Sequence, residues 1–379
     1  MKVAFVTNIC PHYRIKTFEA LARYYHDLDF YFFSAGKEWY WQQQHGVKSG
    51  KFHHQYLKGF EIGGTRITLS LPFKLWRGDY DVYIKCITGR FALPVTYLIA
   101  RLKHRPFILW TGIWMRLQTR AHRLLFPLTR YIYHHADAIV VYGEHVKQYL
   151  ITEGVSPEKI FIAYHAVDND VYNREVSEAE KTALLQILQI EPEQKMLLYL
   201  GRLEEVKGLP YLLDAFAILQ HCNTVLVLAG TGSEQQHLER LAKEKGIDHR
   251  VRFTGYVPPQ ETSPYYATAW VYVLPSITVP AGRELWGLVV NEAFNQGLPV
   301  VASEAVGAAA GGFVKDGVNG FVVPERDSVA LANAIDCILA DPGLRTRFSQ
   351  NARLLVETWD NERMVLGFRQ AIDYVGGKR

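Results

Sequence analysis

The sequence predicts an α/β protein built from two doubly wound, Rossmann-like domains. Short apolar runs of strand length alternate along the chain with helical patterns, which is typical of parallel sheets covered by helices on both faces. This alternation starts twice, at the N-terminus and again near residue 196, and a polar, Glu-rich stretch separates the two series. The 379 residues also suffice for two domains of ordinary size.

The first predicted domain covers residues 1–165 and opens with a strand, a loop and a helix. These are the apolar run KVAFVTN, the segment ICPHYR and the helical pattern FEALARYY. A further helix is expected in ALPVTYLIARLKH, beginning near Pro94. Further strands are expected in LDFYFFS, DVYIKC, FILWTG and ADAIVVYG. Residues 37–68 are rich in Trp, Tyr, His and Gly without a clean period, so we expect an irregular insertion that borders a cleft.

The second predicted domain covers residues 168–360. A polar segment from Asp168 to Gln194 predicts the connection and one helix. The next series begins with MLLYLGRLEEVKG, and Pro210 lies near the start of the following helix, where its missing N–H is tolerated. The same plan of strand, loop and helix recurs with the strands TVLVLAG, VRFTGYV, WVYVL, PVVAS and GFVVP. Ligands of such sheets bind at the carboxyl ends of the strands.

Composition excludes several classes of protein. No apolar run approaches the ~18 residues that a membrane-spanning helix needs, and MKVAFVTN has the pattern of a strand rather than of a signal peptide, so we expect a cytoplasmic location. The four cysteines have no CxxC spacing, which argues against a zinc site and against a disulfide framework. We expect them to be buried thiols: Cys10, Cys86, Cys222 and Cys337.

Charge is distributed unevenly between the two halves. Residues 1–165 hold 22 Lys and Arg against 11 Asp and Glu, whereas the rest of the chain holds 20 against 27. A basic half indicates an anionic partner, which could be nucleic acid, an acidic membrane face or a phosphate-bearing substrate. The alternative is a basic surface that serves solubility.

One basic segment lies between two predicted strands of the first half. The pattern MRLQTRAHRLLFPLTRYIYHHA places Arg116, Arg120 and Arg123 within about two helical turns, beside Trp114. A basic, aromatic and amphipathic helix of this kind can lie peripherally on an anionic membrane, at the inner face of the cell membrane for a cytoplasmic protein. The alternative is a helix that faces the core and leaves its basic side in solvent.

Two carboxylates stand out between Leu274 and Ala302. Glu284 precedes a short predicted helix, GLVVNEAFNQ, and Glu292 lies on it. The free N–H groups at a helix start favour a phosphate or sugar oxygens, so this stretch has the outline of a ligand site. The alternative is that Glu284 only caps the helix and that Glu292 lies on a solvated face.

Two cations follow the first strand of the second domain. GRLEEVKG places Arg202 and Lys207 in a loop between a strand and a helix, where both can reach a phosphate at the helix start. Charge-assisted hydrogen bonds of this kind contribute about 1.5–3 kcal/mol each.

Asp-x-Asp patterns hold a divalent cation in metal-dependent transferases. Two of the patterns of this kind in the chain are candidates for that role: Asp27-Leu28-Asp29, at a strand entrance, and Asp168-Asn169-Asp170, in the connection. Because Arg202 and Lys207 already supply positive charge, we expect no essential metal and no other cofactor.

The order of five motifs resembles that of retaining nucleotide-sugar glycosyltransferases of family four, which have the GT-B fold of two Rossmann-like domains facing a cleft. The motifs are GRLEEVKG, LAGTGSE, VRFTGYV, the Glu284-to-Glu292 spacing in ELWGLVVNE, and GLPVVAS. The resemblance covers nearly the whole chain. It also implies that residues 361–379 pack back on the first domain.

The resemblance implies a role for each motif residue. Arg202 and Lys207 would hold the donor diphosphate, Glu284 the hydroxyls of the transferred sugar, and Glu292 the ribose. The backbone of Trp286, Gly287 and Leu288 would meet the sugar and phosphate, and Gly255, Tyr256 and Val257 would line the base. The motif glycines Gly201 and Gly230 complete the expected donor site.

The first half departs from the family pattern at three loops. Pro11, His12, Tyr13 and Arg14 replace the usual Gly pair, Thr111 to Trp114 replace a segment that often holds a His, and His165-Ala166 replaces Asn-Gly. These departures leave the general base unassigned. The candidate acceptor or cleft residues are His12, Tyr13, Arg14, Thr111 and Trp114.

The sequence therefore predicts a glycosyltransferase that moves a hexose from a nucleotide diphosphate sugar to a glycan or lipid-linked acceptor, with no nucleic-acid partner. Two alternatives remain. One is a sugar phosphorylase or nucleotide-sugar epimerase of similar fold, and the other is a catalytically silent binding protein. Turnover of a donor separates these classes.

Overall fold

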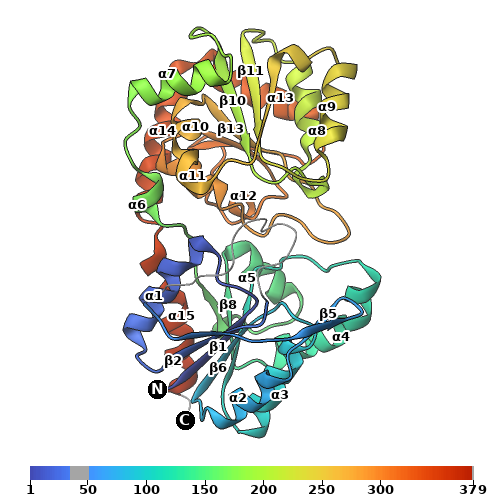
Figure 1. The fold of residues 1–379 in the computed structure, drawn as a ribbon, viewed down its shortest axis with the longest axis vertical. Helices are drawn as coiled ribbons and strands as arrows, with labels where there is room; N and C mark the ends of the chain where they lie inside the picture. Colours follow the sequence, from blue (N-terminus) through green and yellow to red (C-terminus); the bar gives the residue numbers. More distant parts are fainter. Residues whose placement is uncertain (35–50, 378–379) are drawn as a thin grey trace. The chain divides into compact units, whose positions relative to one another are not determined.

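A computed structural model describes residues 1–34 and 51–377, which form two compact units (Figure 1). Unit 1 comprises Met1–Trp114, Arg120–His165 and the C-terminal segment from Asn361. Unit 2 comprises Met115–Thr119 and Ala166–Asp360. Each unit has its own parallel sheet with helices packed against it, which confirms the predicted fold class.

The sheet of unit 1 has the strand order β3-β2-β1-β6-β7-β8-β9, and every neighbouring pair is parallel. Val3 of β1 lies opposite Leu28 of β2 and Val82 of β6. Most of these strands are buried throughout, which explains their continuous apolar runs. Their bounds are β1 Val3–Thr7, β2 Leu28–Phe32, β3 His54–Tyr56, β6 Val82–Cys86, β7 Phe107–Thr111, β8 Ala138–Val141 and β9 Ile160–Ile162.

The helices of unit 1 include one that comes from the far end of the chain. Helix α15 (Asn361–Gly376) packs against α1 (Ile15–Tyr24), β8 and β9 (Figure 1). Phe368 of α15 contacts Phe5 and Trp110, with ring centroids 5.6 and 5.5 Å away. The other helical segments are η1 His12–Arg14, α2 Ser70–Arg77, α3 Ala92–Leu102, α4 Arg120–His135, α5 Glu144–Thr152 and η2 Pro157–Lys159.

Part of the segment predicted to be irregular is ordered into strands. Residues 37–50 lie outside the described residues, but β3 extends the main sheet, and β4 (Phe60–Ile62) pairs with β5 (Thr65–Ile67) as an antiparallel hairpin. Gly63 and Gly64 form its turn with φ of +54° and +68°, which only glycine adopts readily. Strands of three residues are too short to display a period, which is why the pattern concealed them.

The basic segment does not form the single helix that its pattern predicted. Helix α4 begins at Arg120, so Arg116 lies outside it. Residues 115–119 belong to unit 2, where the N–H of Gln118 donates to the carbonyl oxygen of Pro280 at 2.8 Å instead of joining a helix. Of the three arginines Arg116, Arg120 and Arg123, only the last two therefore lie on α4.

The sheet of unit 2 has the strand order β12-β11-β10-β13-β14-β15 and is also parallel throughout. Its strands are β10 Lys195–Leu200, β11 Thr224–Ala229, β12 Val251–Gly255, β13 Val271–Leu274, β14 Val300–Ser303 and β15 Gly320–Val323. Its helical segments are α6 Asn169–Tyr172, α7 Glu178–Ile187, η3 Glu205–Lys207, α8 Leu209–Ala217, α9 Gln235–Glu244, η4 Asp248–Arg250, η5 Pro259–Glu261, α10 Thr262–Thr268, α11 Val289–Asn295, α12 Gly307–Ala310, α13 Ser328–Ala340 and α14 Pro342–Glu357.

Three sequence expectations concern the chain as a whole. Cys10 and Cys86 are buried thiols as expected, but Cys222 and Cys337 are exposed, because they lie in a surface loop and on a surface position of α13. Within residues 1–34 and 51–377, no helix is long and apolar enough to cross a membrane. In the same residues, no three His, Cys, Asp or Glu side chains gather in a way that could hold a metal ion.

Candidate active site

The loops that follow β10 and β11 approach each other closely at two motif glycines. The N–H of Gly201 donates to Ala229 O at 2.9 Å, and a Cβ atom on Gly230 would lie only 1.8 Å from Gly201 O. Glycine is therefore the residue that lets these two backbones meet at the carboxyl ends of their strands. This contact fixes the loop that carries Arg202.

Lys207 and Glu284 form a direct ion pair in unit 2. Lys207 Nζ donates to Glu284 Oε2, and the two side chains are only 11% and 17% exposed. Gly208, with φ of +63°, follows Lys207, and a Cβ atom there would lie 2.2 Å from Pro275 O. This close approach seats the Lys207 loop against the end of β13, from which the Glu284 loop departs.

The backbone after Glu284 is held by the buried ring of Trp286. Trp286 is 1% exposed, stacks on Trp359 at 5.8 Å, and donates from Nε1 to Asn291 Oδ1 at 2.9 Å. Gly287 then takes a φ of +90°, and a Cβ atom there would lie 2.9 Å from the Leu274 side chain. The Trp286 side chain is thus an anchor, which leaves only its backbone to meet a ligand. Leu288 follows as the N-cap residue of α11 without a side-chain cap.

Glu284 is not a helix cap, contrary to the alternative left open by the sequence. It lies four residues before the N-cap of α11, and its carboxylate binds Lys207 instead. Its backbone carbonyl accepts a hydrogen bond from Gly307 N at 3.1 Å. The loop is therefore fixed from both sides, and the carboxylate points to a cation.

Glu292 is not on a solvated face, which removes the second alternative. On α11 it accepts a hydrogen bond from Tyr266 Oη at 2.8 Å and another from the hydroxyl of Tyr172. Burial raises the pKa of the Glu292 carboxyl to about 7, and the two tyrosine hydrogen bonds offset part of that rise. Near neutral pH this carboxyl is therefore partly protonated.

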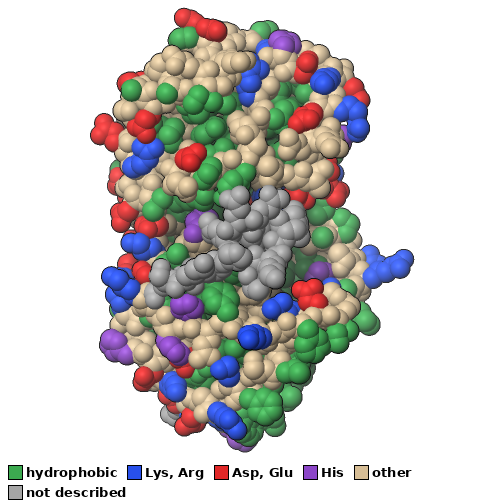
Figure 2. Space-filling model, in the orientation of Figure 1, with side chains coloured by type: hydrophobic (Ala, Val, Ile, Leu, Met, Phe, Trp, Pro, Cys, Tyr) green, Lys and Arg blue, Asp and Glu red, His purple; other side chains and the backbone are tan. Residues whose placement is uncertain are grey.

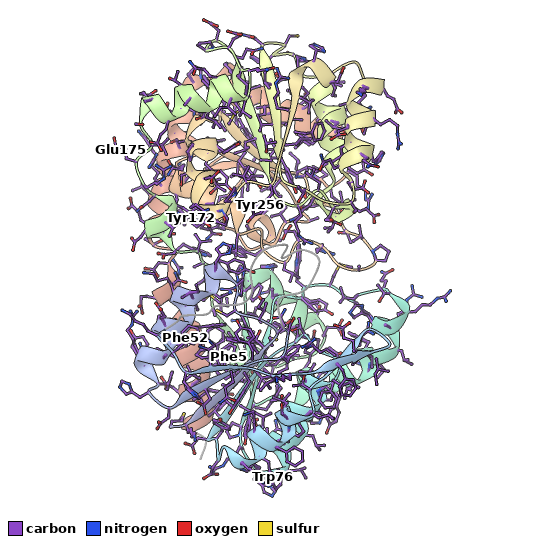
Figure 3. The ribbon with its side chains drawn as sticks, in the orientation of Figure 1. Phe5, Phe52, Trp76, Tyr172, Glu175 and Tyr256 are labelled. Atoms are coloured by element: carbon purple, nitrogen blue, oxygen red, sulfur yellow. The ribbon has the colours of Figure 1, made fainter. Side chains whose placement is uncertain are left out.

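Neither tyrosine was expected from the sequence. Tyr172 belongs to α6 and Tyr266 to α10, and no motif links either residue to Glu292. Tyr256 lies close enough to Tyr172 for its charge to raise the pKa of the Tyr172 hydroxyl further. Figure 3 labels Tyr172 and Tyr256, and both belong to unit 2. Glu292, Tyr172 and Tyr256 thus form one neighbourhood.

The remaining donor-site candidates surround these two groups. Arg202 is exposed, and both its charge and that of Glu284 act on the buried hydroxyl of Tyr199, with Glu284 raising the pKa of Tyr199 and Arg202 lowering it. Gly255 ends β12 with φ of +73°, and Tyr256 and Val257 follow it into the loop. Arg202 and Lys207 therefore lie five residues apart in one short loop, in which Lys207 contacts Glu284 and Arg202 acts on the same tyrosine as Glu284.

The acceptor candidates of unit 1 fall into two groups. Arg14 and Thr111 are buried: the guanidinium of Arg14 contacts a ring nitrogen of His165 at 2.9 Å and Met364 Sδ at 2.8 Å, and Thr111 Oγ1 accepts from Ile113 N at 3.1 Å. His12, Tyr13 and Trp114 are half-buried. They pack edge to face, His12 on Tyr13 and Trp114 on His145.

Arg14 belongs to the core of unit 1. Its guanidinium carbon lies 5.3 Å from the centre of the Trp110 ring and 5.8 Å from that of Tyr142. Burial and the neighbouring Arg14 charge hold the pKa of His165 well below its usual range, so His165 is neutral. The pattern of the early loop gave no sign that Arg14 would face inward.

Comparison with known proteins independently supports the resemblance to glycosyltransferases. Residues 17–171 match the family model Glycosyltransferase Family 4, and residues 180–355 match Glycosyl transferases group 1. An uncharacterized glycosyltransferase of Methanocaldococcus jannaschii is 31% identical over 228 residues, which cover 59% of this chain and 57% of that protein. The lipopolysaccharide core biosynthesis glycosyltransferase LpsE of Rhizobium meliloti is 37% identical over 151 residues, or 40% of this chain and 41% of LpsE.

A solved structure gives a likeness over the full length. Anabaena HepE in complex with UDP has a TM-score of 0.79 and 20% identity, over 98% of this chain and 100% of that one. At this level of sequence identity, the structural likeness supports a shared GT-B fold and nothing further. The chain spans about half the length of the curated relatives that it matches first. The two family models together account for most of the sequence, so the chain carries a domain of Glycosyltransferase Family 4 followed by a domain of Glycosyl transferases group 1.

Proposed function

We propose that this protein is a retaining glycosyltransferase that transfers a hexose from a nucleoside diphosphate sugar to a glycan or lipid-linked acceptor. The observation that carries the proposal is the ion pair between Lys207 and Glu284, which unites the two main motifs at the carboxyl ends of the unit 2 strands. The ion pair places a cation that can bind a phosphate next to a carboxylate that can bind sugar hydroxyls. A nucleotide sugar needs these two groups side by side, because its sugar is joined directly to its diphosphate.

Donor binding breaks the ion pair between Lys207 and Glu284. The Lys207 ammonium turns to a phosphate oxygen, with Arg202 on the outer side of the same loop, and the Glu284 carboxylate accepts hydrogen bonds from hydroxyls of the sugar. The C1–O bond to the diphosphate then breaks, and the two cations stabilise the negative charge that develops on the leaving group. This positive charge acts where a divalent cation would, and we propose that no metal is essential.

Retention follows from attack on the face that the leaving group vacates. The acceptor oxygen forms its bond to C1 on the same face, and its proton passes to an oxygen of the departing diphosphate. This route needs no general base from the protein. It therefore agrees with the sequence motifs, which indicate no such residue.

The nucleoside occupies the neighbourhood of Glu292. Its carboxylate accepts the ribose hydroxyls in place of the Tyr172 and Tyr266 hydrogen bonds, and Tyr256 and Val257 flank the base. A uridine diphosphate sugar is the first donor to test, because HepE was solved with UDP and with UDP-glucose.

The acceptor is anionic in this proposal, and its contacts come from unit 1. Residues 1–165 hold twice as many basic as acidic residues, 22 against 11. His12, Tyr13 and Trp114, which are half-buried, are the candidate contacts, whereas Arg14 and Thr111 support them from within. A lipid-linked phosphate or an anionic glycan fits this charge.

The test begins with a thermal-shift panel of uridine, guanosine and adenosine diphosphate sugars. A donor at ~100 times its dissociation constant adds about 2.7 kcal/mol of stability. The donor that stabilises is then incubated with candidate lipid-linked and glycan acceptors, and the anomeric configuration of the product is read by NMR.

Three outcomes overturn the proposal. Transfer to inorganic phosphate in preference to every acceptor indicates a phosphorylase. Conversion of the donor into its epimer indicates an epimerase. Donor binding without turnover under any condition indicates a silent binding protein.

A further inference from the structure

Three neighbouring helices of unit 1 expose apolar side chains at helical spacing. On α2 these are Leu69, at its N-cap, Phe73 and Trp76, spaced four and three residues apart, so they share one face. On α3 they are one turn apart, and on α4 they again follow the spacing of four and three. The complete set, between 43% and 81% exposed, is Leu69, Phe73, Trp76, Leu98, Leu102, Leu124, Leu128 and Tyr131.

This outer apolar face is additional to the one that holds the fold together. Helix α2 buries Leu71 and Leu75, and α4 buries Ile132 and Tyr133, on their inner faces. A helix that covers a sheet needs only one apolar stripe, and its outer face is ordinarily polar. The second stripe therefore needs an explanation other than the core of unit 1.

Contacts between the helices join the stripes into one surface. Helices α2 and α3 pack against each other, and Lys103 Nζ lies 5.6 Å from the centre of the Trp76 ring and donates to Trp76 O at 2.5 Å. Tyr97 of α3 meets Tyr131 of α4 edge to face at 6.1 Å. Figure 2 shows hydrophobic side chains gathered over α2, α3 and α4, and Figure 3 shows Trp76 pointing outward at the edge of unit 1.

Basic side chains accompany these apolar ones. Residues 57–135 hold 13 Lys and Arg against three Asp and Glu. All three acids lie within ion-pair distance of a basic side chain: Glu61 lies 4.0 Å from Arg66, Asp79 lies 3.8 Å from Lys103, and Asp81 lies 3.3 Å from Arg105. Arg77 on α2 and Arg120, Arg123 and Arg130 on α4 are exposed beside the stripes. The surface thus combines apolar projections with an excess of positive charge.

We propose that the surface formed by α2, α3 and α4 docks on an anionic lipid bilayer. Phe73, Trp76 and Leu124 enter the boundary between headgroups and acyl chains, while Arg77, Arg120 and Arg123 contact lipid phosphates. The charge pattern favours this occupant over a second copy of the chain, because two such surfaces facing each other would bring like charges together. The inference rests on the proposed function in one respect only, since a bilayer is where a lipid-linked acceptor would be found.

The test is co-sedimentation of the full chain with vesicles of phosphatidylcholine alone or with added phosphatidylglycerol. Binding is expected only with the anionic lipid, and it should weaken as salt rises. The double variant Phe73→Ser/Trp76→Ser should lower the partition coefficient by about tenfold or more, since two apolar side chains no longer enter the bilayer.

Matched controls use exposed apolar residues of unit 2. Ile187→Ser on α7 and Leu354→Ser on α14 remove similar side chains and should leave vesicle binding unchanged. A variant Arg120→Glu/Arg123→Glu should abolish the preference for anionic lipid. The unfolding temperature of each variant is measured as well. A value equal to that of the parent shows that the surface change leaves the fold intact.

The inference is overturned if the parent binds neither kind of vesicle, or if Phe73→Ser/Trp76→Ser binds as the parent does. A parent that is dimeric in light scattering, with the same double variant monomeric and no vesicle binding, would assign the surface to a second copy. Vesicle binding requires no turnover, so failure of the proposed transferase activity leaves this result readable.

Discussion

Lys207 and Glu284 are 77 residues apart in the chain, yet their charged groups meet directly inside unit 2. Both side chains are largely withdrawn from water, so each partly neutralises a charge that would be costly to leave alone. A nucleoside diphosphate sugar offers replacements for both partners at once. In the proposed function, the donor separates the two side chains and takes the place of each as the partner of the other.

We expect Lys207→Ala to lower turnover by about 10²- to 10³-fold, because one preorganised cation no longer faces the leaving diphosphate. Binding of free nucleoside diphosphate, measured by calorimetry, should weaken too. Lys181→Ala, which removes a lysine from an ion pair with Glu178 on α7, is the matched control and should change neither quantity. Unchanged binding and turnover in Lys207→Ala would contradict the site.

Glu284→Gln should separate binding from transfer. The amide keeps the shape of the side chain but no longer pairs with Lys207, so free nucleoside diphosphate should bind at least as tightly as to the parent. Transfer of the sugar should fall, since the charged acceptor of its hydroxyls is lost. If Glu284→Gln transfers the sugar at the parent rate, in the same samples whose nucleotide binding is measured by calorimetry, Glu284 does not belong to the site.

The carboxyl of Glu292 makes stability depend on pH. Its pKa is about 7 in the folded chain against an ordinary value of 4.5, so the folded state holds this proton more tightly than the unfolded state does. Stability contributed by the protonated form is present at low pH and is lost as pH rises from 4.5 through 7. We therefore expect Glu292→Gln to unfold at a higher temperature than the parent at pH 8 and at a similar temperature at pH 4.5. An equal difference at both pH values would show this wrong.

The same carboxyl should couple nucleotide binding to pH. If the ionised form accepts the ribose hydroxyls, the affinity for nucleoside diphosphate should rise between pH 6 and pH 8. The phosphate of the ligand also titrates in this range, so the comparison with Glu292→Gln isolates the part due to the protein. Parallel pH profiles in calorimetry for the parent and the variant would assign the whole effect to the ligand.

Gly230→Ala should destabilise unit 2 through a backbone clash. The added Cβ atom would lie 1.8 Å from Gly201 O, and a backbone carbonyl cannot move aside as a flexible side chain does. We expect a loss of about 1–3 kcal/mol or more in the free energy of unfolding. Gly312→Ala, where φ is +75° and nothing lies within 4 Å, tests backbone strain alone and should cost only about 1 kcal/mol in the same denaturation experiment.

Turnover should continue in EDTA, because in the proposed function Arg202 and Lys207 supply the positive charge that a divalent cation would otherwise bring to the diphosphate. The measurement is the initial rate before and after chelation. Complete loss in EDTA that magnesium or manganese restores would refute this expectation.

Local patterns were sufficient for the fold and insufficient for the contacts of the site. Continuous apolar strands such as β1 and β11, and glycines that let backbones meet, can be recognised from short stretches of sequence. The hydrogen bonds from Tyr172 and Tyr266 to Glu292 join three elements distant in the chain, and no local period encodes such a meeting. The prediction of where α4 begins was wrong for the same reason. The backbone of residues 115–119 is hydrogen-bonded within unit 2, and this contact overrides the helical pattern.

The place of α15 in unit 1 has a consequence for how the protein is made. A ribosome completes all of unit 2 before Met364 and Phe368 emerge, so during synthesis the rings of Phe5 and Trp110 lack their partner and the guanidinium of Arg14 lacks its sulfur contact. Unit 2 ends at Asp360, so all of it has been translated by then. The half that is synthesised first is thus the last to receive all of its core residues.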